Sequence, residues 1–490
     1  MKPTEKTELL VTEDGEDTSF CGRRYVYLTF LSPAFAGFLY GYSIGAASGS
    51  ITSLQGLLDD PMSSIMKSAL TSAEVLGALA ASAVAFYIGD IIGRRKEILL
   101  GAFFYFAGTV FTQIAGEGYA YPVAFVGRMI YGVGIGFAMH AAPVYIAEFA
   151  PPDIRGLLIA LKEAFIVGGM LVGYGLVAAV GGMDQEDQWR ISWGFPGIIA
   201  LVVAFFMWIG PESPRWLVMR GRSADAVQAL RYLRPTAPET ALSRDVAEME
   251  SALGEVSSDT SEGGLWRQLC GAKRALLAGL GLVAFQQITG QPTVLYVAQT
   301  IFESAGFSEA DAKYADVIVG GAKLLATLVS VQLVDKAGRR PLLFVGVAIM
   351  LVALLILCIG FGAGYELEAV DGSEEGEMVL VGAWPPIVVV ALVLYVSGYQ
   401  VGFGPITWVI IGECFPLHSR TRALGVAAIS NFGINLLVTL TNGPLTDAVG
   451  ASAVFGFYAA MCVVSLVFIY YFVPETKGKT LEEIEMMLKG

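Results

Sequence analysis

Several polar side chains stand inside long apolar stretches of this sequence. Gln286, Gln287 and Gln291 share one stretch, and Asn431 and Asn435 share another. An amide both donates and accepts hydrogen bonds without carrying charge. Since amides without partners are costly in an apolar helix, these five either bind a neutral polar ligand or join neighbouring helices.

The spacing of these amides predicts how a helix would present them. Gln287 and Gln291 are four residues apart, so they are expected on one helical face. Pro292 removes a backbone donor, which favours a kink where a ligand reaches the backbone. Gln400 and Trp408 flank the segment "GFGP" and add an amide and an aromatic face.

Charged side chains also interrupt apolar stretches, at Arg128, Lys162, Glu163 and Lys323. Ionisable residues inside a membrane are costly and usually functional. Lys162 is expected to point about 100° away from Glu163 around a helix and to extend toward the cytoplasmic surface. His140 is expected to satisfy a neighbouring helix.

The composition requires a membrane. Of 490 residues, 55% are hydrophobic and 15% are charged, whereas soluble domains carry about a quarter charged residues. A bilayer core of about 30 Å needs about 20 apolar helical residues, and the sequence offers twelve such stretches. It therefore predicts an all-α membrane protein with twelve transmembrane helices in two six-helix bundles.

Basic residues set the expected orientation. Outer connections hold only Lys67, Arg190 and Lys313, so both termini are expected to be cytoplasmic. The predicted organisation is a cytoplasmic tail at 1–24, a first bundle at 25–210, a cytoplasmic linker with short helices at 211–274, a second bundle at 275–473 and a cytoplasmic tail at 474–490.

Three motifs occur once in each half: "DIIGRRK" and "DKAGRRP", "EFAPPDIRG" and "ECFPLHSR", "PESPR" and "PETKG". This 6+6 repeat suits alternating access about a midplane site. The repeated charges are expected to form ion pairs that gate one end; static anchoring by the arginines is the alternative. The gating candidates are Asp90, Arg94, Arg95, Glu148, Arg155, Glu212, Arg215, Asp335, Arg339, Arg340, Glu413, Arg420 and Glu475.

These motifs, with "FQQITGQ", "GPITWVIIGECFP" and "PETKGKTLEEIE", resemble the sugar-porter family of the major facilitator superfamily over about residues 25–487. Through "AMHAAPVYIAE" and "ALKEAFIVGGM" the chain is most similar to plant and algal vacuolar or plastidic glucose and xylose carriers. The resemblance implies the major facilitator fold and transport of a monosaccharide, expected to be glucose, by facilitated diffusion or proton symport.

The resemblance also implies site residues. It places Glu163 and Lys323 where relatives have a sugar-binding Gln and Asn, and Pro292 where relatives usually have Asn. The expected substrate-binding residues are Gln286, Gln287, Gln291, Tyr296, Gln400, Trp408, Asn431, Asn435, Glu163 and Lys323.

Coupling is expected to depend on Ser43. Proton-coupled relatives usually carry a carboxylate at this position, opposite an Arg matching Arg128. Ser43 cannot exchange a proton at physiological pH, so it favours facilitated diffusion. The alternative is a proton carrier or gate at Glu163, paired with Lys323 between the bundles; a fixed structural ion pair is a further alternative.

Other functions lack support in the sequence. Five cysteines show no metal or disulfide spacing, and there is no nucleotide-binding or catalytic motif, so no metal, cofactor, nucleic acid or enzymatic activity is expected. A non-transporting sugar receptor on the same scaffold is the remaining alternative. The expected partners are a sugar, the lipid bilayer and, in the symport alternative, protons. The segment "EKTELL" resembles an endomembrane sorting signal, which favours the vacuole or plastid over the plasma membrane.

Overall fold

A computed structural model describes residues 23–58, 60–116, 118–259, 273–296, 298–363, 365–368, 377–380, 382–415, 417–477, 479, 483–484 and 487. The predicted tails at 1–24 and 474–490 lie largely outside these ranges, as do Cys21 and Cys270. The side chains of Asp335 and Arg420 are also outside the described part of the chain.

The first half consists of long helices joined by short connections. They are α2 (Arg24–Leu54) with the 3₁₀ turn η1 (Gln55–Leu57), α3 (Ser64–Ile92), α4 (Arg94–Thr112), α5 (Ala120–Phe149), α6 (Pro152–Val180) and α7 (Gln185–Ile209). Three further helices follow: α8 (Pro214–Met219), α9 (Ser223–Leu233) and α10 (Glu239–Asp259).

The second half repeats this plan with two interrupted spans. Its helices are α12 (Lys273–Ile288), α13 (Gln291–Tyr296), α14 (Ala298–Ser304), α15 (Glu309–Ala337), α16 (Arg339–Ala363), α17 (Trp384–Gly402), α18 (Gly404–Cys414), α19 (Leu417–Val449) and α20 (Ala451–Phe472). Between α16 and α17, strands β1 (Tyr365–Glu368) and β2 (Glu377–Leu380) pair antiparallel, with Tyr365 opposite Leu380.

Most of these helices are long and apolar enough to cross a bilayer. Within the described ranges nine spans meet both requirements, with α17 and α18 counted as one. The helices α2 and α4 and the interrupted α12–α14 bring the total to the twelve predicted from the sequence, which confirms the all-α membrane fold.

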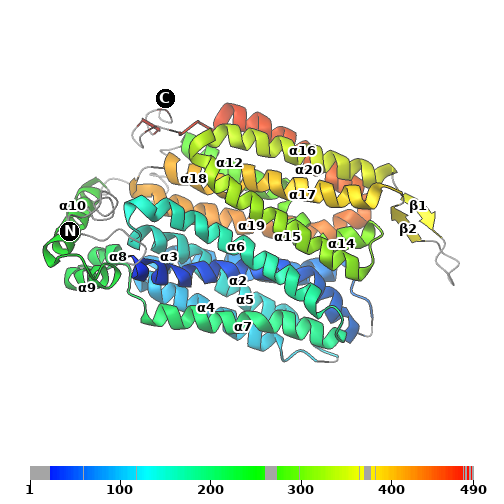
Figure 1. Ribbon diagram of the computed structural model, residues 1–490, viewed down its shortest axis with the longest axis horizontal. Helices are drawn as coiled ribbons and strands as arrows, with labels where there is room; N and C mark the ends of the chain where they lie inside the picture. Colours follow the sequence, from blue (N-terminus) through cyan, green and yellow to red (C-terminus); the bar gives the residue numbers. More distant parts are fainter. Residues whose placement is uncertain are drawn as a thin grey trace, which may run out of the picture.

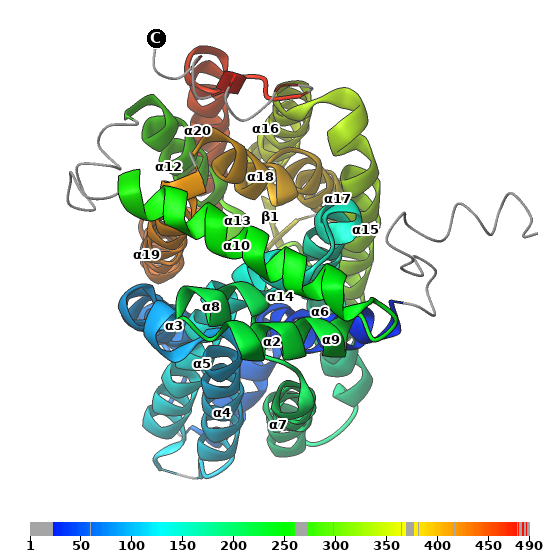
Figure 2. The same cartoon turned by 90° about the vertical axis from the view of Figure 1, so that its left-hand side faces the viewer.

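The two halves lie side by side with their helices roughly parallel (Figure 1). Helix α3 packs against α19, and α6 packs against α15, across the boundary between the halves. The helices α8–α10 cover one end, here called the linker end (Figure 2), and β1 and β2 lie at the opposite, sheet end. Any group at the boundary therefore faces both halves.

Candidate functional site

An amide network joins α12 to α19 in the interior of the second half. Gln287 Nε2 donates to Asn431 Oδ1, and Asn435 Nδ2 donates to Gln287 Oε1 at 3.1 Å. Thr439 Oγ1 extends the chain by donating to Asn435 Oδ1 at 3.2 Å. The structure thus brings together three of the predicted amides, all of them buried.

Polar atoms without a partner lie in neighbouring elements. Gln286 Nε2 donates to Phe403 O at 3.3 Å, but Gln286 Oε1 and Tyr296 Oη are buried without a hydrogen bond in the described part of the chain. A buried polar atom usually has a partner, so both atoms remain able to hydrogen-bond a bound ligand. Trp408 is partly buried against the same apolar core.

The interruption of the seventh span changes the position of Gln291. Helix α12 ends before Gly290, which has φ +100°, and α13 begins at Gln291 itself. Because the helix breaks between them, Gln287 and Gln291 do not share one helical face as the spacing predicts. Instead Tyr395 Oη donates to Thr289 O at 3.1 Å at the break.

Gln400, the remaining predicted amide, lies near Lys323. Its Nε2 donates to Thr327 Oγ1 at 2.8 Å, and Thr327 Oγ1 in turn donates to Lys323 O at 2.8 Å. Gln400 is therefore tied to α15 rather than to the network of α12 and α19.

The charged pair of α6 differs from the prediction. Lys162 is 7% exposed and its Nζ lies 3.0 Å from Glu163 Oε1. The prediction that Lys162 extends to the surface is wrong, because its flexible stem turns back and packs near Gly37 of α2. Lys323 is 3% exposed, and its Nζ lies 5.1 Å from the centre of the Tyr399 ring.

Glu163 and Lys323 do not form a direct ion pair in this structure. The charge of Glu163 still acts on Lys323 across the boundary, but the nearest cation to Glu163 is Lys162. The proposed pairing of Glu163 with Lys323 during the transport cycle stays a prediction.

The sequence analysis missed a second acid inside the membrane, Glu74 of α3. Its side chain is fully buried, and its Oε2 lies 2.8 Å from Arg128 Nη2. Ser43 Oγ donates to the same carboxylate and accepts from Arg128 Nη1 at 3.2 Å. The signal was available as one acid in the apolar run "TSAEVLGALAAS".

Close helix packing holds this carboxylate in place. A Cβ on Gly132 of α5 would lie 2.0 Å from Glu74 O, so only glycine allows α3 to approach there. The guanidinium carbon of Arg128 lies 5.0 Å from the Trp193 ring centre. Arg128, Glu74 and Ser43 therefore form one buried unit contributed by α5, α3 and α2.

Ion pairs at the linker end of the first half join helices of that half. Arg94 lies 2.8 Å from Asp90 Oδ1 and 3.2 Å from Glu148 Oε1. The backbone N–H of Arg95 donates to Glu212 Oε1 at 2.9 Å. This cluster locks the ends of α3, α4 and α5 to the segment before α8.

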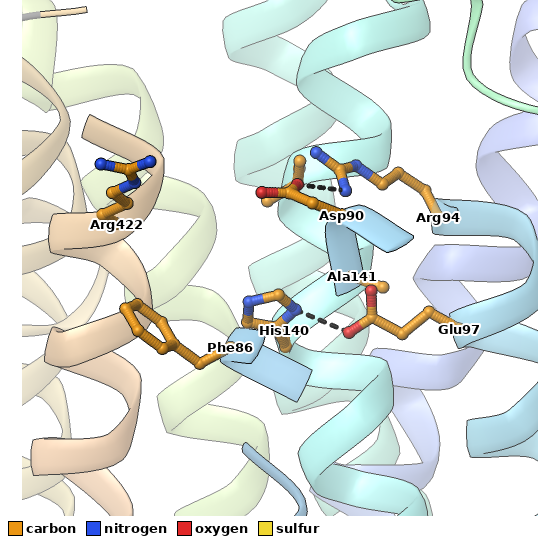
Figure 3. A pocket seen from close by; sticks show the side chains of 8 residues that line it. Phe86, Asp90, Arg94, Glu97, His140, Ala141 and Arg422 are labelled. Carbon is orange, nitrogen blue, oxygen red and sulfur yellow. Dashed lines mark hydrogen bonds and ion pairs between the residues drawn. The ribbon is translucent and has the colours of Figure 1, made fainter. Parts of the chain in front are cut away.

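A pocket opens beside this cluster (Figure 3). His140 Nδ1 lies 2.6 Å from the buried Glu97 Oε1, so His140 satisfies the neighbouring helix α4, as the sequence predicts. Asp90 and Arg94 line the same pocket, which Arg422 of α19 borders from the second half.

The second half repeats the linker-end cluster. Arg339 Nη2 lies 3.0 Å from Glu413 Oε1, and the backbone N–H groups of Arg339 and Arg340 donate to Glu475 at 3.1 and 3.0 Å. These bonds also join elements within one half. Arg155 and Arg215 stand outside both clusters: Arg155 donates to Ala150 O at 3.4 Å and Arg215 is exposed.

Glu212 and Glu475, here called the capping glutamates, accept hydrogen bonds from the backbone at the starts of α4 and α16, but their pKa values shift in opposite directions. Burial raises the pKa of Glu212, although backbone N–H groups of Arg95 and Ser213 donate to it. Burial also opposes ionisation of Glu475, but four backbone N–H donors outweigh it and hold its pKa below the ordinary value. The gating role predicted for all these groups stays a prediction.

Comparison with known proteins identifies the family. A family model described as "Sugar (and other) transporter" matches residues 29–488. The chain is 44% identical to "D-xylose-proton symporter-like 2" of Arabidopsis thaliana, with 94% of this chain and 90% of the relative covered. It is 31% identical to "D-xylose transporter" of Levilactobacillus brevis, with 93% and 94% covered.

Solved structures agree with the sequence relatives. A partially occluded inward-open structure of the xylose transporter XylE from E. coli matches with a TM-score of 0.78 at 26% identity, covering 93% of this chain and all of that one. The same transporter bound to 6-bromo-6-deoxy-D-glucose matches with a TM-score of 0.77 at 27% identity, covering 95% and 100%. These proteins are transporters and not enzymes. The chain therefore belongs to the sugar transporter family of the major facilitator superfamily and is a multi-pass membrane protein.

Proposed function

We propose that this protein carries a monosaccharide, with glucose as the preferred substrate, by alternating access between its two halves. The observation that carries the proposal is the buried amide network of Gln287, Asn431 and Asn435 beside the unpartnered Gln286 Oε1 and Tyr296 Oη. A sugar is uncharged and ringed with hydroxyl groups, so it needs groups of this kind.

The amides already bond to one another, which offsets the cost of burying them. A sugar hydroxyl both donates and accepts, so it can replace one amide partner and satisfy Gln286 Oε1 or Tyr296 Oη in addition. Trp408 supplies an aromatic surface for the C–H face of the ring. If the amides only joined neighbouring helices, Gln286 Oε1 and Tyr296 Oη would not need to lie beside them without full hydrogen bonds.

The relatives support the substrate class. The printed names of four relatives contain D-xylose, and the related XylE structure holds a glucose derivative. An endomembrane location with both termini cytoplasmic is part of the proposal; a relative named "chloroplastic", 40% identical, supports the location, and the distribution of basic residues supports the orientation.

Transport can follow one of two modes, facilitated diffusion or proton symport. Ser43 favours facilitated diffusion, whereas the carboxylate of Glu74, in contact with Ser43, favours proton coupling. The printed name "D-xylose-proton symporter-like 2" is consistent with the second mode. Sugar movement in either mode requires the same binding residues.

The test is counterflow of labelled glucose and xylose in proteoliposomes without any ion gradient. Gln287→Ala removes the centre of the network, and one or two lost hydrogen bonds cost about 1 to 3 kcal/mol, so the apparent Km is expected to rise about 5- to 150-fold. The matched control is Asn442→Ala on α19, because Asn442 bonds to Thr293 at 3.1 Å outside the network.

The two variants separate the outcomes. An unchanged Km in Gln287→Ala, or an equal rise in Asn442→Ala, would contradict this binding site. Sugar binding without counterflow in the wild type would show a receptor instead of a carrier.

A further inference from the structure

Glu74 and Arg128 bury two full charges inside the first half. A buried ion pair offsets the cost of desolvation only when its polar atoms are fully hydrogen-bonded. Here Glu74 Oε1, Arg128 Nε and Arg128 Nη2 make no hydrogen bond within the described part of the chain, although Nη2 lies 2.8 Å from Glu74 Oε2. Such a pair is poorly suited to a purely structural role.

The carboxylate also lies beside the second half. The buried Tyr296 hydroxyl of α13 lies close enough to interact with Glu74 and with Tyr40, although neither contact has full hydrogen-bond geometry. Since Tyr296 belongs to the proposed sugar site, Glu74 stands between Arg128 in its own half and a sugar-site phenol in the other. A change in how the halves meet therefore changes the surroundings of this carboxylate.

A small cavity reaches the same unit from one side. It is bordered by Ser43, Arg128 and Trp193 and extends along α4 to Thr109 and Thr112, the last residue of that helix, toward the sheet end. Water in this cavity would give a proton a short path to Glu74.

We propose that Glu74 is the proton-binding group that couples sugar transport to a proton gradient, acting where Ser43 itself carries no charge. The inference rests on the proposed function. A proton from one solution binds a Glu74 oxygen and neutralises it, which releases Arg128 from the ion pair. After the halves move, the proton leaves Glu74 to the opposite solution and the ion pair forms again, so one proton enters and one leaves.

The groups around Glu74 favour this role over a rival at Glu163. The carboxylate of Glu163 is paired with Lys162, and a quarter of its side chain is exposed. In contrast, one cation contacts Glu74 among the described residues, and the other nearby groups are uncharged at neutral pH. The groups that face Glu74 are Ser43 and Tyr40 from α2, Tyr105 from α4, Arg128 and Tyr131 from α5, and Tyr296 from α13.

The test compares two measurements in the same proteoliposomes: counterflow without a gradient, and accumulation under an imposed pH gradient. With one proton per sugar, the wild type is expected to accumulate sugar about tenfold per pH unit. Glu74→Gln is expected to retain counterflow but to accumulate nothing above equilibrium. Ser43→Asp added to Glu74→Gln returns a carboxylate to the same site and is expected to restore accumulation.

Glu97→Gln is the matched control, because Glu97 is equally buried and paired with His140 but lies in the linker-end pocket; it is expected to accumulate sugar normally. The proposal fails if the wild type shows counterflow without accumulation, or if Glu163→Gln and not Glu74→Gln abolishes accumulation. Absence of counterflow in the wild type would instead overturn the proposed function.

A second measurement needs no variant to fold. A carbodiimide reacts with protonated carboxyl groups in apolar surroundings, so mass spectrometry of the labelled wild type is expected to find the adduct on Glu74, decreasing as pH rises and as sugar is added. Absence of labelling at Glu74 at a pH where accumulation occurs would overturn the proposal.

Discussion

The interiors of the two halves solve the problem of buried polarity differently. The first half uses charges, with Glu74 against Arg128 and Glu163 against Lys162. The amide network of the second half, around Gln287, is neutral, and the buried charges of that half lie apart from it in α15, at Lys313, Asp316 and Lys323. Neutral groups can exchange partners with a sugar at small cost, whereas charges respond to protons. On the proposed function, the amide network recognises the hydroxylated ligand and the Glu74–Arg128 pair responds to protons.

The largest expected loss of folding stability comes from removing one side chain of the buried polar group in each half. Arg128→Leu leaves Glu74 buried without its cation and is expected to cost about 3 to 5 kcal/mol. Asn435→Leu leaves Gln287 Oε1 without its donor and is expected to cost about 1 to 3 kcal/mol. Thermal unfolding in detergent at pH 7 measures both.

The pH dependence sharpens this first prediction. The penalty in Arg128→Leu is expected to shrink as pH falls, because protonation neutralises Glu74, while the penalty in Asn435→Leu stays constant. Glu74→Gln combined with Arg128→Leu is expected to recover part of the loss. If the stability losses of Arg128→Leu and Asn435→Leu show the same pH dependence, the contrast between a charged and a neutral polar cluster is wrong.

A medium loss of folding stability is expected from substituting Gly93 or Gly338, the equivalent glycines that directly precede α4 and α16. Gly93 and Gly338 have φ of +92° and +95°, a conformation that costs about 1 to 3 kcal/mol for other residues. A Cβ would lie 2.7 Å from Glu212 Oε2 at Gly93 and 3.0 Å from Glu475 Oε2 at Gly338. Gly93→Ala is therefore expected to lower the melting temperature more than Gly338→Ala.

Gly175→Ala is the control for these variants, because Gly175 is helical and a Cβ there meets open space. It is expected to leave the melting temperature unchanged or slightly raised. If Gly338→Ala proves the more damaging, the tighter fit inferred for the first cluster is wrong.

The smallest effect is expected at the capping glutamates. The lowered pKa of Glu475 means that it stabilises the fold above its unfolded pKa and that this stability is lost as pH falls through the folded pKa. The raised pKa of Glu212 means the reverse: stability falls as pH rises from its unfolded pKa through its folded pKa.

Glu475→Gln is therefore expected to lower the melting temperature at pH 7, with the difference from the wild type fading below about pH 4. Glu212→Gln is expected to lower it less at pH 7, since the neutral amide avoids burying a charge. Melting curves between pH 4 and 8 decide this, and a larger loss for Glu212→Gln would reverse the assignment.

The sequence predicted the parts of this molecule that depend on periodicity and repetition. Hydropathy gave the twelve spans because each must match the bilayer, and the duplicated motifs correspond to equivalent clusters around Arg94 and Arg339. It failed for Gln291, because the chain leaves the helix at Gly290, where φ is +100° and the Tyr458 ring leaves no room for a Cβ. It failed for Lys162 because the direction of a long flexible side chain is set by its neighbours.

Glu74 shows a different limit. Ser43 alone indicates a neutral site, because sequence separates it from the carboxylate that it touches by 31 positions. The packing of α2 against α3 and α5 supplies the missing charge. A position that lacks a functional group in sequence can therefore receive it from an adjacent helix.

Among the described residues, the hydrogen bonds named for each linker-end cluster join elements of one half, and Arg422 of α19 borders the pocket beside the first cluster. In the proposed alternating-access cycle, each half can therefore move as a rigid unit without stretching the bonds inside its cluster. Direct hydrogen bonds between the halves include those from Tyr174 to Leu295 O, from Lys313 to Gln188, and from Gly443 N to Ser68. These links lie in helices toward the sheet end. In the same cycle, these hydrogen bonds are among the contacts that break when the halves separate at the sheet end.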